Sequence, residues 1–160
     1  MISVRRKGFT LIELIMTVAI IGLLATVTLP LAELSVQHGK EQELRLALRE
    51  IREELDAYKQ AVEDGRIIRS AEKSAYPASL QVLVDGKPDA KDPTNKNKIY
   101  FLRRIPRDPM AADSSLLDID TWGKRSYESP ADDPQEGDNV FDVYSLSPGT
   151  GMNGIPYKNW

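Results

Sequence analysis

The sequence has no cysteine and a single histidine. Without cysteine there is no disulfide, thiol nucleophile or zinc–thiolate site, and one histidine excludes a two-histidine metal centre. A net charge of -3, from 21 Lys and Arg against 24 Asp and Glu, leaves no strongly basic surface for nucleic acid. These absences exclude most metalloenzymes, cysteine proteases and nucleic-acid-binding modules.

Catalytic arrangements are missing as well. His38 stands alone beside a glycine and is interpreted as a surface residue, and the hydroxyls of Ser145 and Ser147 have no histidine or lysine arranged as a base. With 160 residues, 28% charged and 41% apolar, the chain suits one small domain rather than a multi-span membrane protein or a disordered polyelectrolyte. We therefore do not expect an enzyme.

One uncharged run stands out against this average. Leu14–Ala32 carries no charge and is roughly 28 Å long as a helix, close to the thickness of the hydrocarbon core of a bilayer. Arg5, Arg6 and Lys7 precede it, so the positive-inside rule places the N-terminus in the cytoplasm and most of the chain on the other side. The sequence predicts a single membrane span.

A cleaved secretory signal peptide is the alternative interpretation of a basic start and an apolar run. Pro30 argues against it, because it would lie at the third position before a cut after Ala32, where a small residue is expected. Glu13 argues against it too, because an unpaired charge in hydrocarbon is unfavourable by at least ~2.5 kcal/mol on insertion scales. This carboxylate must be neutralised or find a partner.

The residues around Glu13 carry a family resemblance. The stretch Lys7-Gly8-Phe9-Thr10-Leu11-Ile12-Glu13-Leu14 resembles the N-terminal processing motif of type IV pilins and type II secretion pseudopilins. The resemblance implies that a prepilin peptidase cuts after Gly8 and methylates the new amine of Phe9. It also implies that Glu13 pairs with the Phe9 amine of a neighbouring subunit in a filament, where two opposite charges buried together set the stagger between subunits.

Gly22 and Pro30 interrupt the helical pattern of the apolar run. The resemblance implies that such helix-weakening residues let the helix loosen in the assembled filament. A simple kink stays open as the alternative, because membrane helices tolerate glycine and proline. The small glycine also allows close packing of helices.

A second helical pattern follows the apolar run. From Glu41 to Val62, apolar residues alternate at spacings of four and three, which predicts one buried stripe of an amphipathic helix that ends near Asp64-Gly65. The stripe consists of Leu44, Leu48, Ile51, Leu55, Tyr58 and Val62. The chain is thus expected to comprise a leader (1–8), an apolar helix (9–38), its amphipathic continuation (39–66) and a head (67–160).

The head is expected to contain short elements, because it holds nearly all of the 10 prolines. We predict a short helix over Leu80–Val84 and a hairpin of strands over Lys124–Ser129 and Asn139–Ser145, with a polar irregular stretch over Lys87–Lys98. The predicted class is α+β, type IV pilin-like: a long N-terminal helix packed on a small antiparallel sheet.

Three head motifs extend the resemblance to most of the chain. Leu102–Pro109 (Leu-x-x-Ile-Pro-x-Asp-Pro), Trp122–Tyr127 (Trp-Gly-x-x-x-Tyr) and Phe141–Ser145 (Phe-Asp-Val-Tyr-Ser) are similar to the major pseudopilins of type II secretion systems. The resemblance implies a homo-oligomeric periplasmic filament that starts from the bacterial inner membrane, with minor pseudopilins, a platform protein and an assembly ATPase as partners. Two alternatives stay open, a type IV pilus subunit and an anchored periplasmic binding module that does not polymerise.

The C-terminal loop departs from the family pattern. Major pseudopilins typically bind calcium there through acidic side chains and carbonyl oxygens, but residues 146–160 include no Asp or Glu. The remaining candidate ligands are Asp138, Asp142, Asn153 and the carbonyls of Ser147–Gly151. We expect no cofactor, and a turn held instead by backbone contacts and by the packing of Tyr157 and Trp160.

Overall fold

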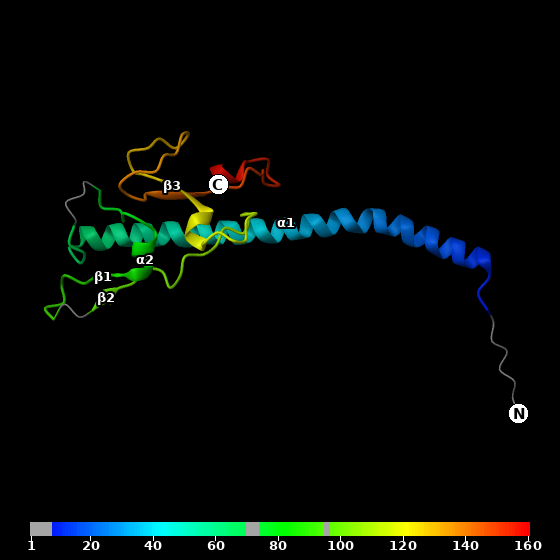
Figure 1. Cartoon of the computed structure of the whole chain (residues 1–160), viewed down its shortest axis with the longest axis horizontal. Coiled ribbons are helices and arrows are strands. Elements are labelled where there is room, and N and C mark those ends of the chain that lie inside the picture. The colour runs from blue at the N-terminus through cyan, green and yellow to red at the C-terminus, as the bar shows by residue number, and fades with distance from the viewer. Residues whose placement is uncertain (1–7, 70–73, 95–96) are drawn as a thin grey trace, which may run out of the picture. The chain divides into compact units, whose positions relative to one another are not determined.

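The computed structural model of the chain describes residues 8–69, 74–94 and 97–160, and the predicted leader residues 1–7 lie outside this range. Its largest element is α1 (Leu11–Glu63), a helix of 53 residues (Figure 1). Two compact units share this helix, Met1–Gly39 and Lys40–Trp160. The predicted long helix and the α+β class are confirmed.

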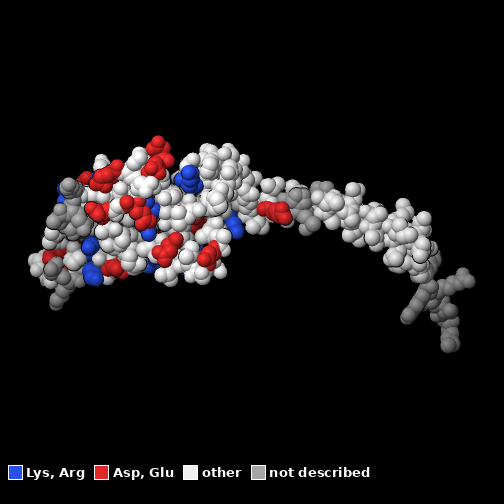
Figure 2. Space-filling model, turned by 45° about the horizontal axis from the view of Figure 1, so that its top comes forward, with Lys and Arg blue, Asp and Glu red and all other residues white. Residues whose placement is uncertain are grey.

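In the N-terminal unit, α1 exposes apolar side chains all around its axis. Leu11, Ile12, Ile20 and Ile21 point to four different sides of the helix, and each is between 56% and 78% exposed. The helix is long and apolar enough to cross a membrane, and none of its most apolar stretch is buried. Figure 2 shows the charged side chains gathered on the C-terminal unit instead.

Threonine hydroxyls in this apolar stretch form hydrogen bonds within the helix. The hydroxyls of Thr17, Thr26 and Thr28 donate to carbonyl oxygens three or four residues earlier, at 2.7–2.8 Å, which suits a hydrocarbon environment. α1 continues through Gly22 and Pro30 without interruption. The family resemblance implies that the helix loosens near Gly22 and Pro30 only in the assembled filament, so this stays a prediction.

In the C-terminal unit, the predicted stripe of α1 is buried. Leu44, Ile51 and Leu55 are at most 1% exposed, and Val62 at the end of the stripe is half-buried. They belong to a single core that also contains Leu80, Leu83, Trp122, Val140, Val143 and Tyr157. Burial of the stripe therefore anchors the head on this half of the helix, as the spacing predicts.

The first head elements follow the end of α1. α2 (Gln81–Asp85) confirms the predicted short helix. Its Leu83 carbonyl accepts hydrogen bonds from the backbone N–H groups of Phe101 and Leu102, both at 3.0 Å. β1 (Lys87–Pro88) then pairs antiparallel with β2 (Lys98–Ile99). The predicted irregular stretch Lys87–Lys98 therefore begins and ends in strand residues. Two residues per strand are too few to show the alternation of side chains by which a strand is predicted from sequence.

A second strand pair lies on the other side of α1 from β1 and β2 (Figure 1). A short 3₁₀ helix (Asp118–Thr121) leads into β3 (Trp122–Arg125), which pairs antiparallel with β4 (Asp142–Ser145). In this register Trp122 lies opposite Ser145, and Arg125 lies opposite Asp142. The predicted hairpin is confirmed. A last 3₁₀ turn, Tyr157–Asn159, closes the chain against the sheet.

The predicted bounds of these strands are wrong, because backbone donors find partners outside the ladder. β3 starts two residues before the predicted strand Lys124–Ser129 and ends where the chain turns at Ser126. The ring of Tyr127 stacks on that of Tyr76, which lies before α2, with 5.9 Å between the ring centroids. Before β4, the Val140 N–H donates to a proline carbonyl at 2.8 Å, so the start predicted at Asn139 is too early.

A buried carboxylate ties the proline-rich segment 105–109 to the sheet. Asp108 is 1% exposed, and its side chain accepts hydrogen bonds from the Ser145 hydroxyl at 2.5 Å and from a backbone N–H two residues on at 2.7 Å. The indole N–H of Trp122 donates to the Pro106 carbonyl at 2.7 Å. Because buried polar groups need such partners, the segment holds one position on β3 and β4.

The same substitution at a buried and an exposed site of α1 tests the packing of the stripe. Leu55→Ala should lower the free energy of unfolding of the head by about 2–5 kcal/mol, because it leaves a cavity in the core. Leu46→Ala, at a position 63% exposed, should change it by less than about 0.5 kcal/mol. Denaturant unfolding of the full chain in detergent measures both, and equal losses would contradict the assigned core.

An ion pair between the end of α1 and β1 predicts a pH dependence. The Arg66 guanidinium donates to Asp89 at 2.7 Å and, with the N–H of Lys91, holds the pKa of that carboxyl below its ordinary value. A lowered pKa stabilises the fold above the carboxyl's unfolded pKa, near 4, and this contribution is lost as the pH falls through the folded pKa.

Arg66→Gln should therefore raise the Asp89 pKa towards its ordinary value and make stability less sensitive to acid. Carboxyl titration by NMR measures the pKa directly. Arg103→Gln, at an exposed position elsewhere in the head, is the matched control and should leave the Asp89 titration unchanged. An unchanged Asp89 pKa in Arg66→Gln would show that the ion pair does not form.

Candidate functional site

The predicted assembly residues lie at the start of α1. Glu13 belongs to its first turn, and its carboxylate accepts hydrogen bonds from the backbone N–H and the hydroxyl of Thr10, both at 3.2 Å. The Glu13 N–H donates back to the Thr10 hydroxyl at 3.3 Å, and the N–H of Leu14 donates to the Thr10 carbonyl at 3.2 Å. This reciprocal pattern is a capping box, which satisfies donors that a helix N-terminus otherwise leaves unpaired.

The structure therefore corrects the premise that Glu13 has no partner within its own chain. The spacing Thr10-x-x-Glu13 has the signature of a capping box, which the sequence analysis missed because it weighed the carboxylate only against its apolar neighbours. The carboxylate also benefits from the positive end of the helix dipole. Both interactions leave acceptor capacity on its oxygens for a further cation.

Gly8 and Phe9 precede the helix and are exposed. Phe9 is 84% exposed, and no side chain approaches the Cα of Gly8. The peptide bond between them lies in an exposed segment without regular secondary structure, before α1 begins at Leu11. A peptidase that needs an unfolded stretch of backbone can reach it, and cleavage there would place a new amine directly before the cap formed by Thr10 and Glu13.

The C-terminal loop is closed by interactions that the sequence did not reveal. Glu41 is 3% exposed, and its carboxylate accepts the N–H of Met152 at 2.9 Å and the hydroxyl of Tyr157 at 3.0 Å. The rings of Tyr157 and Trp160 pack edge to face, 5.1 Å apart, and Gly151 lies so close to Trp160 that a Cβ would be 2.3 Å from the ring. The predicted turn held by these two aromatic residues is confirmed.

Among the described residues, the candidate calcium ligands do not gather into one site. No group of three acidic or histidine side chains is placed to hold a metal ion in residues 8–69, 74–94 and 97–160. Asp142 is bound by two arginines, and the Asn153 side-chain oxygen accepts the N–H of Ile155 at 3.0 Å. Asp138 is exposed. The donor set that calcium prefers is therefore not assembled here.

Comparison with known proteins finds a family whose N-terminal motif this chain shares. Residues 4–29 match the family model of the prokaryotic N-terminal methylation motif, which contains Gly8, Phe9 and Glu13. The long apolar helix and the small antiparallel sheets are consistent with the α+β fold of pilin-like proteins, which carry such a motif.

Several curated proteins of type II secretion systems are similar to this chain over most of its length. The type II secretion system core protein G of Klebsiella pneumoniae is 27% identical over 97% of this chain and 91% of its own length, and that of Pseudomonas aeruginosa is 29% identical over 87% and 94%. The protein of the same name from Vibrio cholerae is 27% identical over 83% and 85%. No solved structure matches significantly. The resemblance to type II secretion major pseudopilins is confirmed.

Substitution of the capping hydroxyl tests the start of α1. Thr10→Val keeps the shape of the side chain but removes the hydroxyl, and loss of such a cap destabilises a helix end by about 0.5–2 kcal/mol. Amide hydrogen exchange of Glu13 in detergent micelles should accelerate by roughly 2- to 30-fold. Thr10→Ser keeps the hydroxyl and should exchange at nearly the native rate, whereas equal exchange in both variants would rule out the cap.

Proposed function

We propose that this protein is a structural subunit of the periplasmic pseudopilus of a type II protein secretion system, anchored in the bacterial inner membrane before assembly. The observation that carries the proposal is the N-terminal unit, in which an exposed apolar helix begins with one capped carboxylate, Glu13, directly after an accessible Gly8–Phe9 bond. The relatives named above, similar over most of their length, support the same role.

The processing steps follow from this arrangement. Prepilin peptidase cuts after Gly8 on the cytoplasmic side and methylates the amine of Phe9, while the apolar helix stays in the membrane. A methylated amine keeps its positive charge, so the new terminus can pair with a carboxylate. The protein meets the peptidase, the platform protein and the assembly ATPase at the membrane, and minor pseudopilins in the filament.

Filament assembly then depends on the charge of Glu13. In the bilayer the apolar side chains contact lipid, and in a bundle they contact the same helix of other subunits, so the transfer conserves apolar contact. The carboxylate would lose stability in an apolar bundle unless a cation replaced water around it. The Phe9 amine of a neighbouring subunit supplies that cation, and the Thr10 cap holds the carboxylate at the helix start.

A structural role also agrees with the head. Among the described residues, the buried polar side chains accept or donate hydrogen bonds that hold the fold, as Asp108 does with Ser145 and Glu41 with Tyr157. His38, Ser145 and Ser147 do not form a catalytic arrangement in the described structure. We propose no enzymatic activity and no binding of nucleic acid.

Replacement of Glu13 tests the proposal. Glu13→Ala should remove filament incorporation almost completely but leave processing largely intact, because cleavage needs the Gly8–Phe9 bond and assembly needs the carboxylate. Glu33→Ala, in the same helix beyond the apolar run, is the matched control and should assemble like the native chain. Cross-linking of cells measures the multimers, and mass spectrometry of the mature N-terminus measures processing.

The outcomes separate the alternatives. A methylated N-terminus at Phe9 with a multimer ladder that Glu13→Ala abolishes supports the filament subunit. Monomers only, or equal behaviour of the two variants, would instead indicate an anchored module that does not polymerise. A mature chain that begins beyond Ala32 would indicate a cleaved signal peptide. Loss of surface pili with intact protein secretion in a deletion strain would indicate a type IV pilus subunit.

A further inference from the structure

We propose that the C-terminal segment of this protein is held by an internal cation, the guanidinium of Arg52, and that its folding is independent of calcium. The inference concerns residues 40–160 alone, so it stands or falls separately from polymerisation. In this proposal Arg52 of α1 holds the C-terminal loop, a role that the family resemblance gives to a calcium ion.

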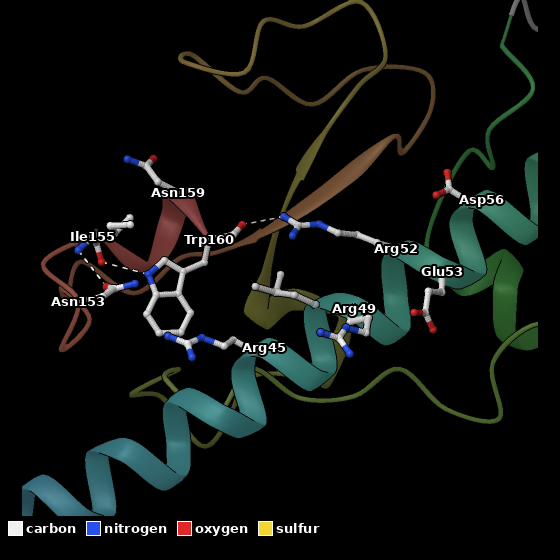
Figure 3. A pocket seen from close by; sticks show the side chains of 10 residues that line it. Arg45, Arg49, Arg52, Glu53, Asp56, Asn153, Ile155, Asn159 and Trp160 are labelled. Carbon is white, nitrogen blue, oxygen red and sulfur yellow. Dashed lines mark hydrogen bonds between the residues drawn. The ribbon is translucent and has the colours of Figure 1, made fainter.

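Arg52 binds oxygen atoms from two separate segments. Its Nε donates to Asp142 Oδ1 at 2.7 Å, and one terminal nitrogen donates to the main-chain oxygens of Val143 at 3.1 Å and Trp160 at 2.8 Å. Figure 3 shows the last of these bonds crossing from α1 to the end of the chain. Side-chain carboxylate and main-chain oxygens are the kinds of ligand that calcium takes in proteins. Here the rigid, permanently charged guanidinium of Arg52 binds these oxygens instead.

The second oxygen of the Asp142 carboxylate is also engaged. Arg125, which lies opposite Asp142 in the sheet, donates to its Oδ2 at 3.2 Å. A divalent cation at this carboxylate would have to displace one guanidinium and approach the other, and like charges at such distances repel. The one acidic side chain on β4 is thus committed to two arginines, and it faces an environment that is already positive.

Three backbone carbonyls of the loop are hydrogen-bonded within it. The carbonyls of Gly149, Gly151 and Ile155 accept backbone N–H groups within the segment, at 2.9–3.1 Å. One oxygen of the Glu41 carboxylate, Oε1, accepts two hydrogen bonds, from the N–H of Met152 and from the hydroxyl of Tyr157, and so ties the loop to α1. Arg45 lies over the Trp160 ring, 4.4 Å from its centroid, and covers the outer side of the last residue.

Together these contacts give the segment the two things that a metal ion would supply. A positive charge joins β4 to the end of the chain through Arg52, and the turn between them is closed by Glu41 and Tyr157. All of these groups belong to the chain, so the closed loop should form whether or not calcium is present.

Thermal unfolding of the full chain in detergent, followed by tryptophan fluorescence, tests the proposal. The native midpoint should be the same, within the error of the measurement, in chelator and in millimolar calcium, with magnesium as the control for ionic strength. Arg52→Met should lower the midpoint by roughly 3–10 °C, because it removes charge-assisted hydrogen bonds that a flexible apolar chain cannot replace. Arg49→Met, exposed on the same helix and outside these bonds, should change it by no more than about 2 °C.

A saturable rise of the native midpoint with calcium but not magnesium would overturn the proposal, and so would equal midpoints in Arg52→Met and Arg49→Met. Equilibrium dialysis of the native chain against radioactive calcium needs no variant and should detect no stoichiometric binding, whereas one ion per chain would overturn it. Should Arg52→Met fail to fold, Arg52→Lys keeps the charge without the fork and should show a smaller fall in the midpoint.

Discussion

The burial of apolar surface differs between the two halves of α1, and this difference governs the structure. In residues 40–63 the apolar side chains form one stripe, and the core of the head covers it. In residues 11–39 they point in all directions, and the described part of the chain contains no surface that covers them. Such an area of exposed apolar surface is unfavourable in water. An apolar environment, such as the lipid and the neighbouring helices of the proposed function, would remove this cost.

Ionisable side chains at the start of α1 and in the head form hydrogen bonds with other groups of the same chain. At the start of α1, Thr10 satisfies the carboxylate of Glu13. In the head, Glu41 anchors the C-terminal turn and Arg52 joins that turn to the sheet. These three side chains therefore each have a hydrogen-bond partner among the described residues of the same chain. Further partners change the environment of these charges but do not have to create the fold.

The accuracy of the sequence-based predictions follows the range of the interactions involved. The stripe from Leu44 to Val62 and the short helix at residues 81–85 were predictable because helical periodicity is local. Strand bounds were not, because Tyr127 and Val140 find their partners in a distant segment near residues 76–77. In the assembly site, the motif from Gly8 to Glu13 was evident, and the cap of Thr10 was readable but overlooked. Glu41 does not belong to the predicted apolar stripe but is buried, because its partners Met152 and Tyr157 lie more than a hundred residues further along the chain.

The amino-acid sequence by itself determined the apolar helix, its amphipathic continuation and the match to the N-terminal methylation motif, because each depends on residues that are neighbours along the chain. Only the tertiary structure decided how the loop at residues 146–160 is closed. Arg52 and Asp142 are 90 positions apart, and Glu41 and Tyr157 are 116 apart. No local pattern relates residues at such separations. They meet because the buried stripe of α1 positions the head, and the packing of that core selects which charged side chains of the helix face the end of the chain.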